Sequence, residues 1–214
     1  MEKIFVVGGG PSLKNFDFKL LTHYKTIAVN KSVFDLENPT YFITMDYSFT
    51  KKIGEKAGWL LTLDCPKIFV AGLDVPHIVE KEGRFIDTRF NMIYDLYMFD
   101  VIIKSYKRDG LSLSLAGFRN GWNSGYCGLQ LAIALGYTEI YLLGIDLCVN
   151  NNDTHYHGGY GEPKEKLESK LEIYYQLFKE GLNLAKIAGI KVYSCSPISR
   201  LNEIIPYVNI KEVL

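Results

Sequence analysis

The chain has 214 residues, of which 48% are hydrophobic and 22% are charged. This composition is that of an ordinary globular protein, and the length suits one domain, so disordered and low-complexity classes are excluded. Basic and acidic residues each number 24, and a formal charge of zero argues against a dedicated nucleic-acid binder and against a polybasic membrane anchor.

Six short apolar runs, rich in Val, Ile, Phe and Tyr, have the pattern of β-strands. They cover residues 3–7, 26–29, 41–44, 67–71, 139–143 and 191–195. Each run is continuous rather than alternating, which indicates burial on both faces, as in a parallel sheet covered by helices.

Helical patterns lie between several of these runs. Ser124 is expected to cap a helix that runs to Leu135 and stops at Gly136. Gly189 is expected to end a second helix, and a weaker helical pattern over 46–60 is interrupted at Gly54. Apolar residues spaced by three or four predict one face of the second helix: Leu167, Leu171, Tyr174, Phe178, Leu182 and Ala185.

The alternation of strands and helices predicts an α/β fold. We expect a Rossmann-like, mostly parallel sheet with helices on both faces, in a single nucleotide-binding domain over 1–214. Residues 75–120 break the pattern, and we expect a small irregular insertion there. Its segments DLYMFDVIIKSY and SLSLAGF have the pattern of a hairpin or of edge strands.

The spacing of the cysteines and the sequence of the N-terminus bear on the cellular compartment of the protein. Each of the four cysteines lies more than four residues from the next one, which is not a zinc-binding spacing, so we expect reduced thiols. The start, MEKIFVVGGGPSL, is not typical of a signal peptide, and no run approaches the ~18 apolar residues of a spanning helix. We therefore expect a cytoplasmic protein without a membrane span.

The glycine-rich segment FVVGGGPSL follows the first predicted strand. Its glycines let a backbone approach a ligand, Pro11 suits the first turn of a helix, and N–H groups at a helix start favour an anion. The segment matches neither GxGxxG nor GxxxxGK[ST], so neither a nicotinamide cofactor nor a standard P-loop is indicated. We expect a phosphate or nucleotide loop, and a tight strand–helix turn is the alternative.

Polar residues follow the second and third strands at the same predicted edge of the sheet. Asn30 is either a turn former or a ligand-binding residue. Asp46 caps the next helix, accepts a hydrogen bond from a ribose hydroxyl, or holds a metal ion. Asn123, Ser124 and Gly125 start a helix, which offers either plain capping or a second positive helix end near this edge.

Two histidines follow the strand that ends in Gly144 and Asp146. His155 and His157 lie two residues apart in a glycine-rich loop, which fits a metal site, a general base, a phosphate contact or a surface loop. Asp146 near a histidine would orient its ring or bind Mg²⁺.

In this order, the motifs resemble the bacterial sialyltransferases of glycosyltransferase family 42. The similar segments are VVGGGPSL, AVNKS, NSGYCGLQLAIALGYTEIYLLGID, DTHYHG and KVYSCSPISRL. They are also similar to the related DUF115 group, which includes flagellin-glycosylation proteins, an archaeal 6-hydroxymethylpterin diphosphokinase and small phage proteins. The resemblance covers about 3–46 and 120–209.

The resemblance implies roles for particular residues. The glycine loop with Ser12 and Asn30 would hold the nucleotide, the Ser-Gly pair would hold phosphate, and His155 would deprotonate the acceptor hydroxyl. The candidate nucleotide-binding residues are Gly8, Gly9, Gly10, Pro11, Ser12, Asn30, Asp46, Asn123, Ser124, Gly125 and Gly144, and the candidate catalytic residues are His155 and Asp146.

This chain also departs from family 42. Asp46 stands where those enzymes have Asn, Cys148 stands in place of a Tyr, and only 149–154 remain of a long tyrosine-bearing lid. The fold and the nucleotide site are therefore expected to transfer, whereas CMP-sialic acid as the donor is not.

Three functions are consistent with these motifs. The first is a nucleotide-sugar-dependent glycosyltransferase with His155 as base and no metal cofactor. The second is a diphosphokinase that binds ATP and Mg²⁺ through Asp46 and Asp146. The third is a non-catalytic nucleotide-binding or assembly protein.

The expected partner is a nucleotide or a nucleotide sugar, and no nucleic acid is expected. The resemblance also implies a homo-oligomer, with exposed aromatic residues as candidate contacts: Trp59, Tyr94, Tyr97 and Phe99.

Overall fold

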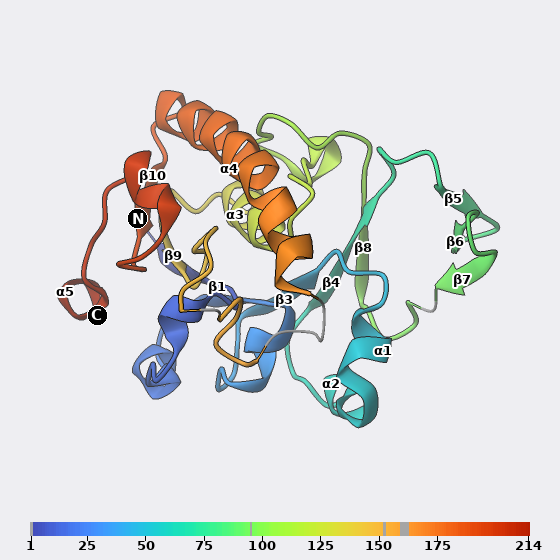
Figure 1. The fold of residues 1–214 in the computed structure, drawn as a ribbon, viewed down its shortest axis with the longest axis horizontal. Helices are drawn as coiled ribbons and strands as arrows, with labels where there is room; N and C mark the ends of the chain where they lie inside the picture. Colours follow the sequence, from blue (N-terminus) through green and yellow to red (C-terminus); the bar gives the residue numbers. More distant parts are fainter. Residues whose placement is uncertain (1, 95, 152, 159–162) are drawn as a thin grey trace.

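The computed structural model describes residues 2–94, 96–151, 153–158 and 163–214. Within them, one parallel sheet has the strand order β10-β9-β1-β2-β3-β4-β8 (Figure 1). Its strands are β1 (Lys3–Val7), β2 (Thr26–Val29), β3 (Tyr41–Thr44), β4 (Lys67–Gly72), β8 (Val101–Ser105), β9 (Glu139–Leu143) and β10 (Lys191–Ser194). The α/β, Rossmann-like prediction is confirmed, and the six predicted strands match within one residue at each end.

The strand order places a switch point beside β1. From β1 the chain steps outward through β2, β3 and β4 on one side, and it returns to the other side with β9 and β10. The loops after β1 and β9 therefore lead away in different directions at the carboxyl edge of the sheet. In open α/β sheets a crevice for ligands forms at such a point.

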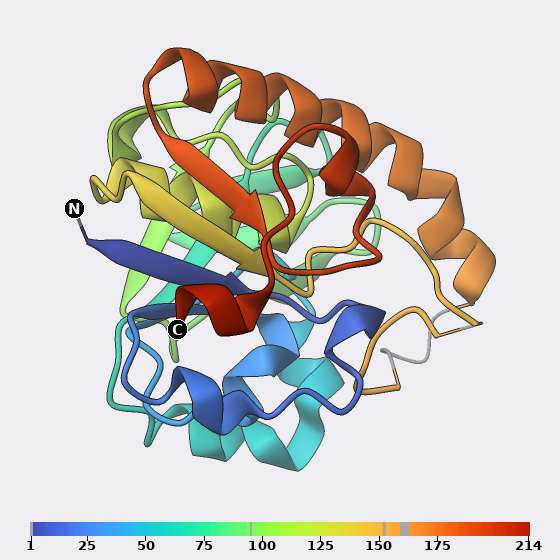
Figure 2. The same cartoon turned by 90° about the vertical axis from the view of Figure 1, so that its left-hand side faces the viewer.

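Two long helices, α3 (Ser124–Ala134) and α4 (Lys164–Ile187), cover one face of the sheet (Figures 1 and 2). Nearly every residue of α3 is buried, which explains why its sequence is apolar all round. Gly128 allows close packing, because a Cβ there would lie 2.6 Å from Val6 Cγ1. The stop that we expected at Gly136 is confirmed by its left-handed φ of +88°.

The predicted apolar face of α4 is confirmed, and one part of it packs in the core whereas the other part lines a cleft. Phe178, Leu182 and Ala185 are buried in the core against the sheet and α3. Leu167, Leu171 and Tyr174, nearer the start of the helix, are only partly buried and line a cleft. Across the described residues, no helix is both long and apolar enough to cross a membrane.

The opposite face of the sheet is covered by short helices, shown in blue and cyan in Figure 2. The predicted helix over 46–60 is two pieces, α1 (Phe49–Ile53) and α2 (Ala57–Leu60), separated at Gly54, where φ is +55°. The chain ends in α5 (Ile210–Val213). The 3₁₀ helices are η1 (Pro11–Leu13), η2 (Phe18–Leu21), η3 (Asn30–Phe34), η4 (Gly54–Lys56), η5 (Leu115–Gly117) and η6 (Arg200–Glu203).

The predicted insertion over 75–120 is partly an extension of the main sheet. A small antiparallel sheet is formed by β5 (Ile78–Lys81), β6 (Arg84–Asp87) and β7 (Met92–Tyr94), and β8 then joins β4 in parallel. The segment SLSLAGF is not a strand and contains only η5. Its serines bond locally, since the Ser112 hydroxyl donates to the Ser114 carbonyl, and such contacts compete with sheet pairing.

The aromatic residues proposed for self-association differ in exposure. Tyr97 is 71% exposed, but Phe99 is buried, stacks on Phe42 and contacts Phe69 in a tilted arrangement. Phe99 is therefore a core residue, and contact between copies through Tyr97 or Trp59 stays a prediction. All four cysteines are free thiols.

An ion pair in the small sheet makes stability depend on pH. Asp87 is buried and accepts hydrogen bonds from Nε (3.0 Å) and Nη2 (2.7 Å) of Arg89, which lower its pKa to about 2. Its stabilising effect is present above the unfolded-state pKa of about 3.9 and is lost as the pH falls through about 2.

We expect Asp87→Asn to lower the urea midpoint at pH 7, and this deficit should shrink between pH 4 and pH 2. Urea titrations at pH 7, 4 and 2 measure it, with Asp109→Asn at an exposed position as the control. A deficit that is the same at all three pH values would contradict the prediction.

Candidate functional site

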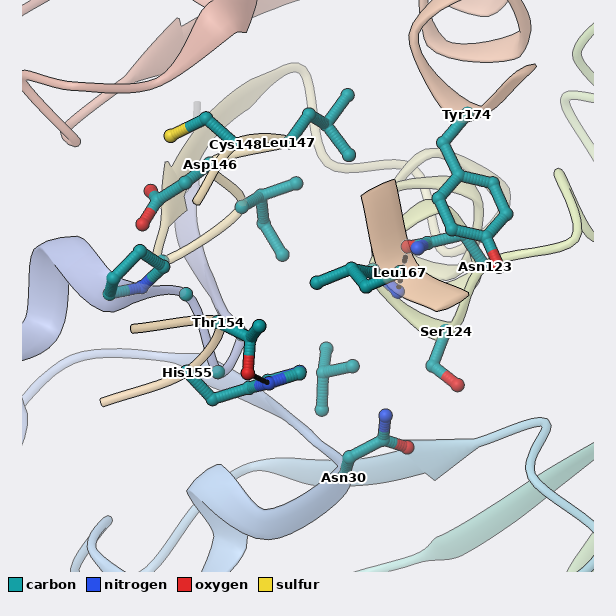
Figure 3. A pocket seen from close by; sticks show the side chains of 18 of the residues that line it. Asn30, Asn123, Ser124, Asp146, Leu147, Cys148, Thr154, His155, Leu167 and Tyr174 are labelled. Carbon is teal, nitrogen blue, oxygen red and sulfur yellow. Dashed lines mark hydrogen bonds between the residues drawn. The ribbon is translucent and has the colours of Figure 1, made fainter. Parts of the chain in front are cut away.

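An open cleft with about 600 Å³ of empty space lies at the switch point beside β1 (Figure 3). It is bounded by the carboxyl ends of β1, β2 and β9, by the first turn of α3 and by the start of α4. The structure brings residues of five distant segments to its wall: Gly8, Gly9, Gly10 and Pro11; Asn30; Asn123, Ser124 and Gly125; Gly144 and Asp146; and His155.

Two N–H groups of the glycine loop (residues 8–10) donate to backbone carbonyls at the end of β9 and are therefore not available to a ligand. Gly8 N–H donates to the Leu143 carbonyl at 2.7 Å, and Gly10 N–H donates to the Gly144 carbonyl at 2.8 Å. Pro11 begins the single turn of η1, so the expected first-turn proline is confirmed, but no longer helix follows. We expected several backbone N–H groups here to be available to an anion. Of the three glycines, only Gly9 has an N–H that donates to no described residue.

Asp146 is buried and faces the glycine loop. Its two oxygens accept hydrogen bonds from Ser12, from the backbone N–H at 2.7 Å and from the hydroxyl at 2.8 Å. Burial raises the pKa of Asp146, and the hydrogen bonds from Ser12 and Ser196 oppose that rise. The Ser196 hydroxyl lies 3.0 Å from Ser12 Oγ and accepts from Gly144 N–H at 2.9 Å.

This network fixes three loops against one another. Figure 3 shows the Asp146 carboxylate turned away from Ser124 and Tyr174. The ring of His155 contacts Thr154 and His157, and a role of Asp146 in orienting a histidine stays a prediction. Asp146 and Ser12 therefore shape the cleft by holding the glycine loop.

Asn30 directs an amide into the cleft. Its backbone is left-handed, with φ of +55°, and its Oδ1 accepts a hydrogen bond from Thr44 Oγ1 at 2.7 Å. This bond fixes the side chain so that the amide nitrogen points toward the centre of the cleft (Figure 3). A donor held in this way suits a polar ligand group.

The start of α3 differs from expectation by one residue. Asn123 is the cap, since its Oδ1 accepts from the backbone N–H groups of Gly125 (2.8 Å) and Tyr126 (3.2 Å). Ser124 is the first helical residue, and its Oγ accepts from Met45 N–H at 3.2 Å. The Ser124 hydroxyl can therefore donate its hydrogen to a ligand, at a helix end that carries partial positive charge.

His155 reaches the cleft from the loop after β9. Tyr156 N–H donates to the Gly9 carbonyl at 3.1 Å, which holds this loop against the glycine loop. The Nδ1 of His155 lies 3.0 Å from Thr154 Oγ1, and its ring stacks on His157 with centroids 5.0 Å apart. A Cβ at Gly9 would lie 3.2 Å from His155 Cδ2, so a glycine there leaves room for the ring.

Asp46 lies in an adjoining part of the cleft. One oxygen accepts from the backbone N–H (3.0 Å) and the hydroxyl (2.8 Å) of Ser48, and the other pairs with Lys52 Nζ at 2.7 Å. Asp46 is paired with Lys52, Asp146 is hydrogen-bonded to Ser12, and the two carboxylates line different parts of the cleft, so Mg²⁺ binding by this pair stays a prediction. Among the described residues, no group of three or more His, Cys, Asp or Glu side chains is placed to hold a metal ion.

The sequence analysis overlooked several residues of the cleft. Trp122 lines its outer part with a left-handed φ of +51°, its Nε1 donates to Asp74 at 2.8 Å, and the Arg108 guanidinium lies 4.1 Å from its ring centroid. Lys166 and Lys170 of α4 line the same part. Trp122 stands inside the motif NGWNSG, whereas the lysines could be located only by knowing where α4 begins.

Comparison with known proteins identifies this fold. No protein-family model matches the chain, and no curated protein sequence matches it. The solved structure of the sialyltransferase CST-II in complex with a trisaccharide acceptor and CMP is similar, with a TM-score of 0.58 and 22% identity over 96% of this chain and 86% of that chain. This chain therefore shares its overall fold with that sialyltransferase.

Two further solved structures agree. CstII from Campylobacter jejuni with the substrate analogue CMP-3FNeuAc has a TM-score of 0.56 and 21% identity, over 97% of this chain and 86% of that chain. The monofunctional alpha-2,3-sialyltransferase Cst-I from Campylobacter jejuni has a TM-score of 0.52 and 20% identity, over 97% of this chain and 80% of that chain. The fold shared with these sialyltransferases thus covers nearly the whole chain, whereas similarity to the DUF115 group stays a prediction.

Proposed function

We propose that the protein is a nucleotide-sugar-dependent glycosyltransferase in which His155 is the general base. The main support is the convergence on one cleft of the Asn30 amide, the Ser124 hydroxyl at a helix start and the His155 imidazole, from three segments that are distant in the sequence. The fold adds support, because the similar solved structures include sialyltransferases bound to CMP and to the substrate analogue CMP-3FNeuAc.

The phosphate of the donor would lie between Asn30 and the start of α3. The Asn30 amide, the Ser124 hydroxyl and the Gly9 N–H are the donors nearest to this space, and Lys166 and Lys170 add positive charge at its mouth. Donors that are already fixed in place stabilise charge as it develops on a leaving phosphate, at little cost in reorganisation.

The transfer step needs a base on the acceptor side. The Nδ1 of His155 lies 3.0 Å from Thr154 Oγ1, and the tautomer in which Nδ1–H donates to this hydroxyl makes Nε2 the basic ring nitrogen. The acceptor oxygen forms a bond to the anomeric carbon, the bond from that carbon to the phosphate oxygen breaks, and the phosphate leaves with the electron pair. Nε2 takes the hydroxyl proton, a task that suits an imidazole near neutral pH.

The ligand class is tested by thermal shift with CMP, UDP, ADP and ATP, each with and without Mg²⁺. We expect CMP or UDP to raise the melting temperature equally with and without the metal. At 100 times the dissociation constant the stabilisation is about 2.7 kcal/mol, or roughly 5–11 °C for a chain of this size.

Asn30→Ala should remove most of this shift, whereas Asn38→Ala should keep it. The two asparagines are a matched pair, because both have a left-handed φ, of +55° and +53°, and Asn38 is exposed outside the cleft. A response to ATP that requires Mg²⁺ would instead support the diphosphokinase alternative, and no response to any nucleotide would contradict the proposal.

A further inference from the structure

A second cavity lies beside the histidine loop, with about 840 Å³ of empty space. Its wall is formed by η3, by α1 with η4, and by the loop that holds His155. The lining residues are Lys31, Phe34, Asp35, Lys52, Ile53, Lys56, Tyr156 and His157. His155 lines the first cleft and His157 lines this cavity, so the stacked pair of imidazoles stands between the two.

Three ammonium groups from three different elements line this cavity. Lys31 comes from η3, Lys52 from α1 and Lys56 from η4, whereas among the described residues of this wall Asp35 carries the single carboxylate. That carboxylate accepts a hydrogen bond from the Tyr156 hydroxyl at 2.5 Å. Positive charge therefore exceeds negative charge on this wall, which favours an anionic ligand.

The lysines are close enough to disturb one another. Burial lowers the pKa of Lys31, and the charges of Lys56 and Lys52 lower it further. Ammonium groups from three elements that line one cavity give it a positive field, and such a field attracts the acidic group of a ligand. The charge of the lining residues thus favours binding of an acidic group in this cavity.

The cavity is connected to the proposed reaction site through Lys52. This residue lines both the cavity and the part of the cleft that contains His155, Trp122 and Ser124. A molecule that spans the two places would present one end to the lysines and the other end to His155. The rings of Phe34 and Tyr156 offer flat apolar surfaces for the body of such a molecule.

We propose that this cavity binds an acidic group, a carboxylate or a phosphate, on the acceptor whose hydroxyl is deprotonated by His155. The inference rests on the proposed function and specifies its acceptor class as an acidic sugar or glycan. Lys31 and Lys56 hold the acidic group, and Lys52 adds charge while it stays paired with Asp46.

The test compares neutral and acidic sugars of one size. Galactose, galacturonic acid and galactose 6-phosphate are titrated calorimetrically into the protein, with and without saturating CMP. We expect the carboxylate or the phosphate sugar to bind at least about tenfold more tightly than galactose, the equivalent of roughly 1.4 kcal/mol. Whichever acidic sugar binds more tightly identifies the acidic group.

The double variant Lys31→Met/Lys56→Met should lose this preference while its affinity for CMP stays unchanged. Lys51→Met is the matched control, because Lys51 is an exposed lysine of α1 outside both cavities. Equal binding of galactose and both acidic sugars, or an acidic preference that survives in the double variant, would overturn the inference. Failure of the proposed function is separate, since it would be seen as the absence of a response to both CMP and UDP in the unaltered protein.

Discussion

His155→Ala is expected to lower turnover about 10²- to 10⁴-fold, with nucleotide affinity unchanged. The imidazole lies at the wall of the cleft next to Thr154, whereas the phosphate donors come from Asn30 and α3, so its removal takes away the base but leaves the nucleotide contacts. Turnover is measured as nucleotide release from the CMP- or UDP-sugar that the thermal shift selects, and affinity is measured by titration of the free nucleotide.

His23→Ala is the control for this experiment, because His23 is an exposed histidine near the end of η2, outside the cleft. It should leave both turnover and affinity unchanged. Undiminished turnover in His155→Ala would reject the base role. A fall in nucleotide affinity as large as the fall in turnover would instead assign His155 to binding.

Gly10→Ala is expected to destabilise the protein and to impair nucleotide binding together. A Cβ at Gly10 would lie 2.4 Å from Asp146 Oδ2 and 2.7 Å from the Gly144 carbonyl oxygen, and neither atom can move without breaking the network around Ser12. Crowding of this kind costs typically 1–3 kcal/mol, which for a chain of this size lowers the melting temperature by roughly 2–12 °C.

The matched control is Gly58→Ala in α2, where an added Cβ would meet nothing within 4 Å. A glycine in a helix is destabilising by roughly 0.5–1 kcal/mol relative to alanine, so this variant should melt at the same temperature or slightly higher. A Gly10→Ala protein that melts and binds nucleotide like the unaltered chain would show that the glycine loop is less tightly held than the structure describes.

The parallel sheet could be predicted because each of its central strands is a continuous apolar run in the sequence. Runs such as Lys3–Val7 and Glu139–Leu143 are apolar on both faces, which few other structures require. The edge strand Val101–Ser105 is exposed on one side and has no such pattern, so its pairing with β4 depends on the rest of the sheet. The small sheet likewise consists of short strands whose pairing only the folded chain determines.

The sequence predicts which residues line the cleft but not which of their polar groups are available to a ligand. Asn30, Ser124 and His155 follow buried segments, and parallel strands bring such residues to one edge. The sequence cannot tell which N–H groups remain available once Gly8 and Gly10 bond to β9. Nor can it place Lys31 beside Lys56, because that proximity depends on how η3 packs against η4.

Helix α4 joins the lining of the cleft to the interior of the protein in one rigid element. Leu167, Leu171 and Tyr174 face the proposed ligand, and the core residues Phe178, Leu182 and Ala185 begin about one turn later. A ligand seated against the first turns thus strengthens the same cooperative unit that melts when the interior loosens. Thermal inactivation and global unfolding should accordingly follow a common temperature course.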